Sequence, residues 1–385
     1  MTLILFVIIL GALIFVHELG HFISAKKAGI RVDEFALGFP PKLWSKKIGE
    51  TVYSLNLIPF GGFVKIFGED GLENANLTQT DADSSIPHVE KEEARSDATE
   101  DFNRRFTSKP KWVQALVLCS GVLGNIIFAW LLISGSFLSG IQSSVEGRYA
   151  AHVREPKLTI TSVLPESPAE RAGLKAGDSI SFIEQGSGVL RFQSMDAEGA
   201  RHFISKSEGA LSITYLRRGE SGAVQVLPVQ GIVEGKPAIG VTLHTVGVVQ
   251  FGFFRSFYEG VLMTWDLLRE VTVGLFGFIR QAFLGQADLT AVTGPVGIAG
   301  LVGEARVLGF VYLLSFTAFI SVNLAVINLL PIPALDGGRL LFLAVEAAIR
   351  RPIPQKFTRV VNTAGFILLL LFMAFITYRD IVKLL

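Results

Sequence analysis

Two histidines and a glutamate near the N-terminus have the types and the spacing of a hydrolytic metal site. The stretch His17-Glu18-Leu19-Gly20-His21 follows the pattern His-Glu-x-x-His, which on a helix sets both imidazoles on one face, one turn apart, where they can bind a zinc ion. Glu18 lies one residue after the first ligand, close enough to polarise a metal-bound water. The sequence therefore predicts zinc-dependent hydrolysis with Glu18 as the catalytic residue.

The motif lies inside the first apolar run of the chain, which extends from about Leu3 to Ile23. An ionisable group at the centre of a membrane-embedded helix costs about 2.5–3.5 kcal/mol, so such groups are usually there for function. A signal peptide with stray polar residues is the alternative. However, the run is preceded by Thr2 and by no basic residue, and no clean cleavage site follows it. We therefore expect a transmembrane helix that carries the metal site.

A catalytic zinc usually has three protein ligands and an open position for water, so a third ligand is required. Asp336 stands out because Pro331 and Pro333 break a helix just before it and leave irregular backbone at membrane depth. Such backbone is tolerated only where it is buried in protein or lines a water-filled cavity. An ordinary helix-ending turn with a capping aspartate is the alternative. With the first motif, Asp336 completes a predicted site for one Zn²⁺ per chain, a metal that these ligand types favour.

The composition is that of a membrane protein. Half of the residues are hydrophobic and the formal net charge is +1, a balance that gives no reason to expect nucleic-acid binding. The single cysteine, Cys119, lies in an apolar segment, so we expect no structural disulfide. Apolar runs of about 20 residues can cross a hydrocarbon core of ~30 Å. The predicted fold is a polytopic α-helical membrane protein with four transmembrane helices, in the segments of residues 1–30, 110–140, 305–350 and 360–385. The third of these helices is predicted from about Val307 to Leu330.

A further helical run, residues 250–285, carries too many charges for a lipid-facing span and is predicted to be an amphipathic helix on the membrane surface. Basic residues cluster after the first span, before the second and between the last two. By the positive-inside rule these loops are cytoplasmic, and the block of residues 140–305 faces outward. If residues 250–285 also crossed the membrane, the third core helix would flip and its end would face away from His17 and His21. A shared metal site therefore requires four spans.

Together the motifs resemble those of the site-2 protease family of intramembrane zinc metalloproteases, specifically its bacterial sigma-E-regulator branch. Three stretches carry the resemblance: residues 17–21, residues 293–298 (Thr-Gly-Pro-Val-Gly-Ile) and residues 323–338, which begin Asn-Leu-Ala-Val-Ile-Asn and end Pro-Ile-Pro-Ala-Leu-Asp-Gly-Gly. The resemblance covers nearly the whole chain in the expected order. One departure is Gly38-Phe-Pro-Pro41, where the family usually has Gly-Phe-Gly-Pro, which bears on substrate handling.

The resemblance implies a multi-pass protein of the bacterial inner (cytoplasmic) membrane, with its active site towards the cytoplasmic side. Its substrates would be single-span membrane proteins in the lipid bilayer, such as anti-sigma factors or remnant signal peptides. The resemblance also implies residue roles. It assigns zinc binding to His17, His21 and Asp336, the catalytic base to Glu18, and the holding of the substrate chain or the developing oxyanion to Asn323, Asn328, Pro331 and Pro333.

Residues 31–68 are predicted to form a membrane-associated β-hairpin or sheet. The stretch Thr51–Phe67 contains two β-rich runs joined through a proline and two glycines. A helical substrate must be unwound before attack, and an exposed strand edge would pair with its extended chain and satisfy the freed backbone groups. We expect this contact at Gly61, Gly62 and Phe63. The alternative is a hairpin packed on the protein's own core. The following residues, 69–109, are acidic and polar, which predicts a flexible cytoplasmic insertion.

Residues 148–246 predict an outward-facing soluble α+β domain inserted between the spans. Alternating apolar residues mark strands at Leu158–Val163, Ser179–Ile183, Leu211–Leu216 and Val224–Val229. The stretch Ser167-Pro-Ala-Glu is a capping box with proline at the first helical position.

This block resembles a bacterial PDZ domain, with Ile239, Gly240 and Val241 in its ligand-binding loop and strand. PDZ domains bind chain ends or extended strands by β-augmentation. We therefore expect a size filter or sensor that admits pre-trimmed peptide ends. A structural domain that binds nothing strongly is the alternative.

The predicted function is an intramembrane zinc metalloendopeptidase that takes part in regulated intramembrane proteolysis. A non-proteolytic, membrane-anchored PDZ adaptor for envelope proteins is the alternative from another class. The adaptor hypothesis predicts damage to a metal ligand or to the base, yet His17, Glu18, His21 and Asp336 are all present. A transporter would need ionisable residues along a path through the membrane, whereas the charges here cluster at one depth.

Overall fold

The computed structural model describes residues 1–69, 102–185, 188–191, 197–207, 209–217, 219–233, 236–286 and 292–384. They form two compact units, one from Met1–Ser134 with Phe257–Leu385 and the other from Gly135–Ser256. Most of the predicted acidic insertion at residues 69–109 lies outside the described residues. Its described end contains a short 3-10 helix, η2 (Phe106–Ser108).

Within the described residues, four helices of the first unit are long and apolar enough to cross a membrane, the number that the sequence predicts. They are α1 (Thr2–Lys27), α4 (Lys111–Ser139), α9 (Phe310–Asn328) and α11 (Gln355–Leu384). Few of their side chains are charged because a bilayer core excludes charge. Many of their large apolar side chains are exposed, as expected of helices that face lipid.

The third predicted span, from about Val307 to Leu330, corresponds to α9. Around it, residues 295–349 form α8 (Pro295–Leu308), α9 and α10 (Asp336–Ile349). Gly309 has φ +122°, a backbone conformation that favours glycine and ends α8. The two prolines before Asp336 end α9, as their chemistry requires. The prediction used the proline break but missed the glycine break.

The N-terminus of α8 is capped by a carboxylate from another helix. Oδ2 of Asp380, on α11, accepts a hydrogen bond from the backbone nitrogen of Gly297 at 2.9 Å, and the Asp380 side chain is buried. The first amide groups of a helix have no partner in the helix itself. A buried carboxylate there satisfies one of them and interacts favourably with the helix dipole. Asp380 therefore fixes α8, which packs on α1 through Val302 and Phe6.

Replacing Asp380 by leucine is expected to lower the stability of the protein by about 1–2 kcal/mol, because the capping bond is lost. The measurement is thermal unfolding of the detergent-solubilised protein with and without the substitution. Asp380→Asn is the matched control, since its amide oxygen can still accept from Gly297. Equal stability of the leucine variant and the wild type would show that this cap contributes nothing.

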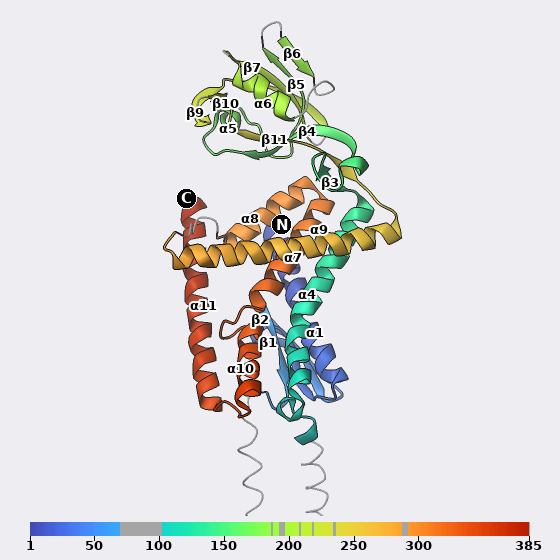
Figure 1. Cartoon of the computed structure of the whole chain (residues 1–385), viewed down its shortest axis with the longest axis vertical. Helices are drawn as coiled ribbons and strands as arrows, with labels where there is room; N and C mark the ends of the chain where they lie inside the picture. Colours follow the sequence, from blue (N-terminus) through green and yellow to red (C-terminus); the bar gives the residue numbers. More distant parts are fainter. Residues whose placement is uncertain are drawn as a thin grey trace, which may run out of the picture. The chain divides into compact units, whose positions relative to one another are not determined.

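One long helix of the first unit runs crosswise to the others. From Phe257 onward, α7 (Phe253–Phe283) extends across α4 and α11 rather than along them (Figure 1). It is joined to α4 by a hydrogen bond from Trp130 Nε1 to the carbonyl oxygen of Phe257, 2.9 Å. Large apolar side chains such as Trp265 and Phe276 are exposed on it. The helix is not one of the candidate spans, and its mixed surface suits a membrane interface.

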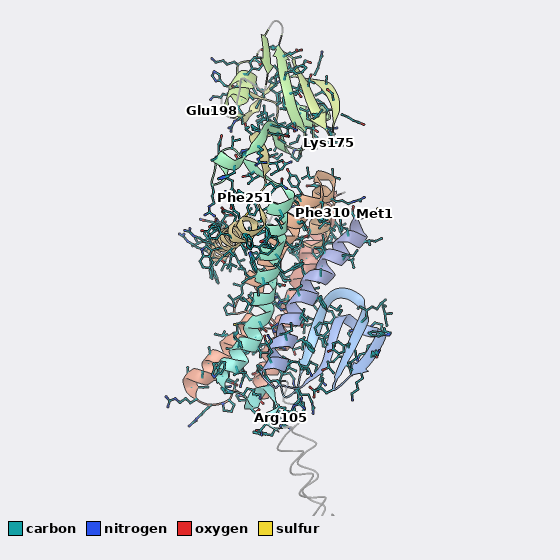
Figure 2. All side chains as sticks on the ribbon, turned by 90° about the vertical axis from the view of Figure 1, so that its right-hand side faces the viewer. Met1, Arg105, Lys175, Glu198, Phe251 and Phe310 are labelled. Atoms are coloured by element: carbon teal, nitrogen blue, oxygen red, sulfur yellow. The ribbon has the colours of Figure 1, made fainter. Side chains whose placement is uncertain are left out.

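Beside α1, β1 (Val32–Ile48) and β2 (Thr51–Ile66) form an antiparallel sheet (Figure 2). Both strands bend, so Phe35 pairs with Tyr53 on one side and with Val64 on the other. The two β-rich runs predicted within residues 51–67 therefore flank the same central segment. The second run, residues 62–66, is an edge, because β1 is its strand partner and no other described strand pairs with it.

Aromatic and charged contacts fix this sheet to α1. The ring of Phe22 on α1 meets the ring of Phe35 edge to face, with centroids 5.4 Å apart, a preferred aromatic geometry. Glu50, in the turn between the strands, accepts hydrogen bonds from Lys26 at 2.5 Å and from Arg104 at 2.6 Å. These two cations lower the pKa of the Glu50 carboxyl group. The sheet is thus held to α1 through Phe35 of β1 and through the turn between the strands.

The second unit is an α+β structure built on one main antiparallel sheet, as predicted. Its strand order is β3-β11-β4-β5-β7-β8, with β6 paired to β5. Its core contains Ile160, Ile183, Ile213 and Leu243, all fully buried. The elements are β3 (Ile141–Ser144), η3 (Ala150–His152), β4 (Arg154–Val163), α5 (Pro168–Arg171), β5 (Ser179–Gln185), β6 (Gly188–Arg191), α6 (Ala197–Ser205), β7 (Leu211–Arg217), β8 (Glu220–Val226), β9 (Val229–Val233), β10 (Lys236–Ala238) and β11 (Val241–Val249).

The predicted strands of this unit are present, with one error. The run Val224–Val229 is not one strand, because β8 ends at Val226 and β9 begins at Val229. The predicted cap is confirmed: the Ser167 hydroxyl accepts from the backbone nitrogen of Glu170 at 3.3 Å, and α5 begins with proline. Local sequence chemistry thus sets the start of this helix.

Candidate active site

The three predicted metal ligands meet at one point inside the first unit. His17 and His21 lie one turn apart on α1, and Asp336 is the first residue of α10. The Nε2 atoms of the two histidines are 3.3 Å apart. Oδ2 of Asp336 lies 3.0 Å from Nε2 of His17 and 3.3 Å from Nε2 of His21. Among the described residues, these three form the one group of His, Cys, Asp and Glu side chains arranged to hold a metal ion.

The donor atoms fit a zinc ion. Zinc–ligand bonds of ~2.0–2.1 Å in a tetrahedral site place ligand atoms about 3.3 Å from one another, close to the distances found here. Within the described structure, the buried Oδ2 of Asp336 has no hydrogen-bond donor other than the two ring nitrogens that face it. A carboxylate oxygen and two imidazole nitrogens directed at one point are the ligand set expected for this metal.

The ring of His21 is oriented by a backbone carbonyl. Its Nδ1 lies 2.8 Å from the carbonyl oxygen of Val117 on α4. Because a carbonyl can only accept, Nδ1 carries the proton, which leaves the lone pair of Nε2 available to bind a metal ion. Metal-binding histidines usually donate their second N–H to such a group, which fixes the ring and its tautomer.

Helix α4 can approach α1 this closely because both helices have glycines at the contact. A Cβ atom at Gly121 would lie 2.3 Å from Nε2 of His21, and one at Gly20 would lie 2.2 Å from the carbonyl oxygen of Ser120. A Cβ at Gly124 would lie 2.8 Å from the carbonyl oxygen of Val16. These positions were missed from the sequence. Ser120 and Gly124 form a small-x-x-x-small pattern in an apolar helix, a recognisable sign of close helix packing that could have indicated this contact.

The backbone around Asp336 is held in an unusual shape. Ala334 has φ +72°, which is uncommon for a residue other than glycine, and its nitrogen donates to Oδ1 of Asn362 on α11 at 3.3 Å. A Cβ at Gly337 would lie 2.2 Å from the carbonyl oxygen of Leu330, so only glycine fits there. This packing turns the start of α10 back towards α1 and presents Asp336 to the two histidines.

The metal site opens into a cavity of 190 Å³. Glu18, the predicted catalytic base, lines it beside the two histidines. Arg339 and Glu69 also line it and form an ion pair with each other. Gly62 and Phe63 of the edge strand are in the lining, and a Cβ at Gly62 would lie 3.1 Å from Cγ of Glu18.

The remaining predicted residues of the first unit do not line this cavity. Gly61 packs against the ring of Phe39. Asn323 donates its side-chain amide to the carbonyl oxygen of Phe319 within α9, 2.8 Å. Asn328 is the last residue of α9, and Pro331 and Pro333 lie in the following turn. Asn328, Pro331 and Pro333 belong to the chain segment that leads to Asp336, and none of them forms part of the cavity wall.

The second unit has a separate groove of 1040 Å³, between α6 and the start of β11. The predicted residues Ile239, Gly240 and Val241 line it, together with His202 on α6. Gly240 has φ +82°, a conformation that suits glycine in a tight loop. Residues 241–245 of β11 pair with β4, and their other edge lies on the side of the groove.

Residues 5–372 of the chain match the protein-family model described as "Peptidase family M50". The chain is 32% identical to the zinc metalloprotease RasP of Geobacillus kaustophilus, over 99% of this chain and 98% of that protein. It is 31% identical to the regulator of sigma-W protease RasP of Bacillus subtilis, over 100% of this chain and 99% of that protein.

These matches run through both parts of the first unit and through the whole second unit, so they cover every residue of the predicted site. The adaptor alternative loses its support, because the relatives are zinc metalloproteases and the three ligand side chains converge in the structure. The protein is a membrane-embedded zinc metalloprotease, and the chain belongs to peptidase family M50, the site-2 protease family.

Proposed function

We propose that this protein is an intramembrane endopeptidase that cuts a membrane-spanning segment of single-span proteins. In this proposal His17, His21 and Asp336 hold one zinc ion and Glu18 is the catalytic base. The observation that carries it is the convergence of three donor atoms, 3.0–3.3 Å apart, of which two come from a helix long enough to span a membrane. A metal site on such a helix serves substrates that lie in the bilayer.

The chemistry divides between the metal and the chain. Bound zinc lowers the pKa of a water molecule from ~15.7 to about 7 and polarises a carbonyl oxygen. Glu18 takes the proton of the attacking water and returns it to the leaving amine. Its place in the cavity wall beside both histidines supports this role. Asn323 and Asn328, at the end of α9, are proposed to hold the substrate chain or the developing oxyanion.

The substrate must be extended at the site of cleavage. A transmembrane helix hides its carbonyl groups in hydrogen bonds, and unwinding it in lipid leaves polar groups without partners. The edge strand at residues 62–66 is placed to pair with these polar groups, because it lines the cavity that contains Glu18. The extended substrate is proposed to add to this edge as a further strand, with main-chain hydrogen bonds supplying the affinity.

The second unit is proposed to be a PDZ domain that faces outward and binds pre-trimmed peptide ends. Two features support this: the groove between α6 and β11, and the glycine at its closed end with φ +82°. An extended peptide would pair with β11 and place its end near Ile239 and Gly240. The basic loops beside the spans support a bacterial inner membrane location with the active site towards the cytoplasmic side. The name of the Bacillus subtilis relative, a regulator of sigma-W protease, supports anti-sigma factors as substrates.

The test compares detergent-solubilised wild type with Glu18→Gln on a panel of single-span substrates, with a zinc assay on both proteins. We expect the wild type to cut inside the membrane segment. The variant should retain one zinc per chain and lose at least ~10²-fold in rate, the usual contribution of a general base. Cleavage by the wild type should stop with a chelator and return with zinc. Cleavage confined to soluble loops would contradict the proposal, as would full activity of the variant.

A further inference from the structure

Asn125 is a buried amide next to a metal ligand, and none of the roles described above uses it. It lies on α4, and its side chain is 0% exposed. Its Nδ2 is 3.3 Å from Nδ1 of His17, whereas its Oδ1 has no hydrogen-bond partner among the described residues. Its backbone oxygen accepts from the hydroxyl of Ser321 on α9 at 2.8 Å. The residue thus sits where α1, α4 and α9 meet, with one polar group directed at His17.

The two nitrogens of His17 have different neighbours. Nε2 faces His21 and Asp336, at 3.3 and 3.0 Å, and Nδ1 faces Asn125. A neutral imidazole carries one proton. If Nε2 gives its lone pair to a metal, the proton is on Nδ1, which then needs an acceptor. An amide oxygen is an acceptor and an amide NH₂ group is not.

A half-turn about the Cβ–Cγ bond of Asn125 exchanges its oxygen and nitrogen without changing the shape of the side chain. It places Oδ1 next to Nδ1 of His17, where a hydrogen bond can form. The oxygen that now has no partner would then have one. The site would become symmetric in its chemistry: His21 donates Nδ1–H to the carbonyl oxygen of Val117, and His17 donates Nδ1–H to the amide oxygen of Asn125.

We propose that Asn125 is a positioning residue that holds His17 in the tautomer that binds zinc. It acts through His17 and touches neither substrate nor metal. The inference rests on the proposed function, in which His17 is a zinc ligand. Loss of such a supporting hydrogen bond typically weakens metal binding 10–100-fold, so the effect is measurable as an affinity, independently of activity.

Two substitutions that keep the branching of the side chain at Cγ separate the acceptor from the side-chain shape. Asn125→Leu replaces the amide by two larger methyl groups and removes the acceptor, and we expect it to bind zinc 10–100-fold more weakly. Asn125→Asp supplies acceptors and no donor, and we expect zinc affinity close to that of the wild type. The measurement is competition for zinc between the full-length detergent-solubilised protein and a series of chelators of graded affinity.

Thermal unfolding of the metal-free proteins checks for a purely structural role. The oxygen of the Asn125 amide has no hydrogen-bond partner among the described residues. We therefore expect Asn125→Leu not to lower the stability of the metal-free protein. Ser321→Ala is the matched control, because it breaks the hydrogen bond to the backbone of Asn125 and leaves the amide in place. We expect this control to bind zinc like the wild type.

Two outcomes overturn the proposal. If Asn125→Leu binds zinc as tightly as the wild type, no acceptor is needed. If Asn125→Asp binds zinc as weakly as the leucine variant, the NH₂ group matters and the oxygen does not. Should the leucine variant fail to fold, Asn125→Ala replaces it as the variant without an acceptor, and the same two outcomes are read from the alanine and aspartate variants. His17→Ala separates this inference from the proposed function. If His17→Ala binds zinc as tightly as the wild type, the proposed ligand set is refuted. If His17→Ala loses zinc while Asn125→Leu binds it tightly, the role of Asn125 alone is refuted.

Discussion

Replacing Gly121 by alanine is expected to remove zinc from the protein and to abolish cleavage. The added Cβ would lie 2.3 Å from Nε2 of His21 and 2.8 Å from Cε1 of His17, distances that real Cβ contacts do not show. Separating the helices to make room would break the close contact between Gly20 of α1 and the backbone of α4 at Ser120. Either His21 leaves its position or the contact between the helices opens.

The measurement is zinc content per chain after dialysis, followed by chelator competition on any metal that remains. We expect the affinity of Gly121→Ala to fall by at least ~100-fold, the upper part of the range for damage near a ligand. Gly11→Ala is the matched control: it makes the same substitution in α1, where a Cβ would have no neighbour within 4 Å. Stoichiometric zinc of normal affinity in Gly121→Ala would show that α4 does not lie over the ligands as described.

The three predicted ligands differ in how directly the sequence indicates them. The spacing of His17 and His21 sets both rings on one face because helix geometry is local, so two ligands follow from four residues of chain. Asp336 follows from an argument about backbone chemistry, since prolines at membrane depth need a buried or wet place. The structure brings these three side chains together.

The residues that support the ligands could not be predicted in the same way. Val117 orients His21 through its backbone oxygen, a group that every residue has and that leaves no trace in the sequence. Gly121 is defined by a contact with a helix 100 residues earlier in the chain, and Asp380 caps a helix 83 residues away. Such pairings depend on the tertiary arrangement of helices, which local patterns do not encode.

The β-rich segment at residues 51–67 could be predicted in part. The alternation and the glycines predict two runs, and both runs form. Which of them is the edge could not be read from the sequence, because it depends on how β1 bends back. Residues 44–48 of β1 pair with the outer side of the first run, which leaves the second run with a strand partner on one side alone. The consequence for function is that residues 62–66, and not the first run, line the cavity with Glu18.

Substitution of Gly62 is expected to give the opposite phenotype from Gly121→Ala: zinc stays and cleavage is lost. A Cβ at Gly62 would lie 2.9 Å from Cγ2 of Ile14 and 3.1 Å from Cγ of Glu18. An alanine side chain at this position would therefore clash with α1, and a valine side chain would clash more severely. The edge strand must then move away from the catalytic helix, and a displacement of about 1 Å between a bound chain and the reacting groups can reduce the rate ~10²-fold.

The experiment measures kcat/KM and zinc content for Gly62→Ala and Gly62→Val, with Gly300→Val as the control because a Cβ at Gly300 would have no neighbour within 4 Å. We expect a graded loss, larger for valine, at unchanged zinc content. Full activity of Gly62→Val would contradict the placement of the substrate on this edge. Loss of zinc in that variant would mean that the strand supports the metal site itself. Because the metal ligands lie on α1 and α10 and the edge lies on β2, metal binding and substrate presentation are carried by different elements, and single substitutions should separate them.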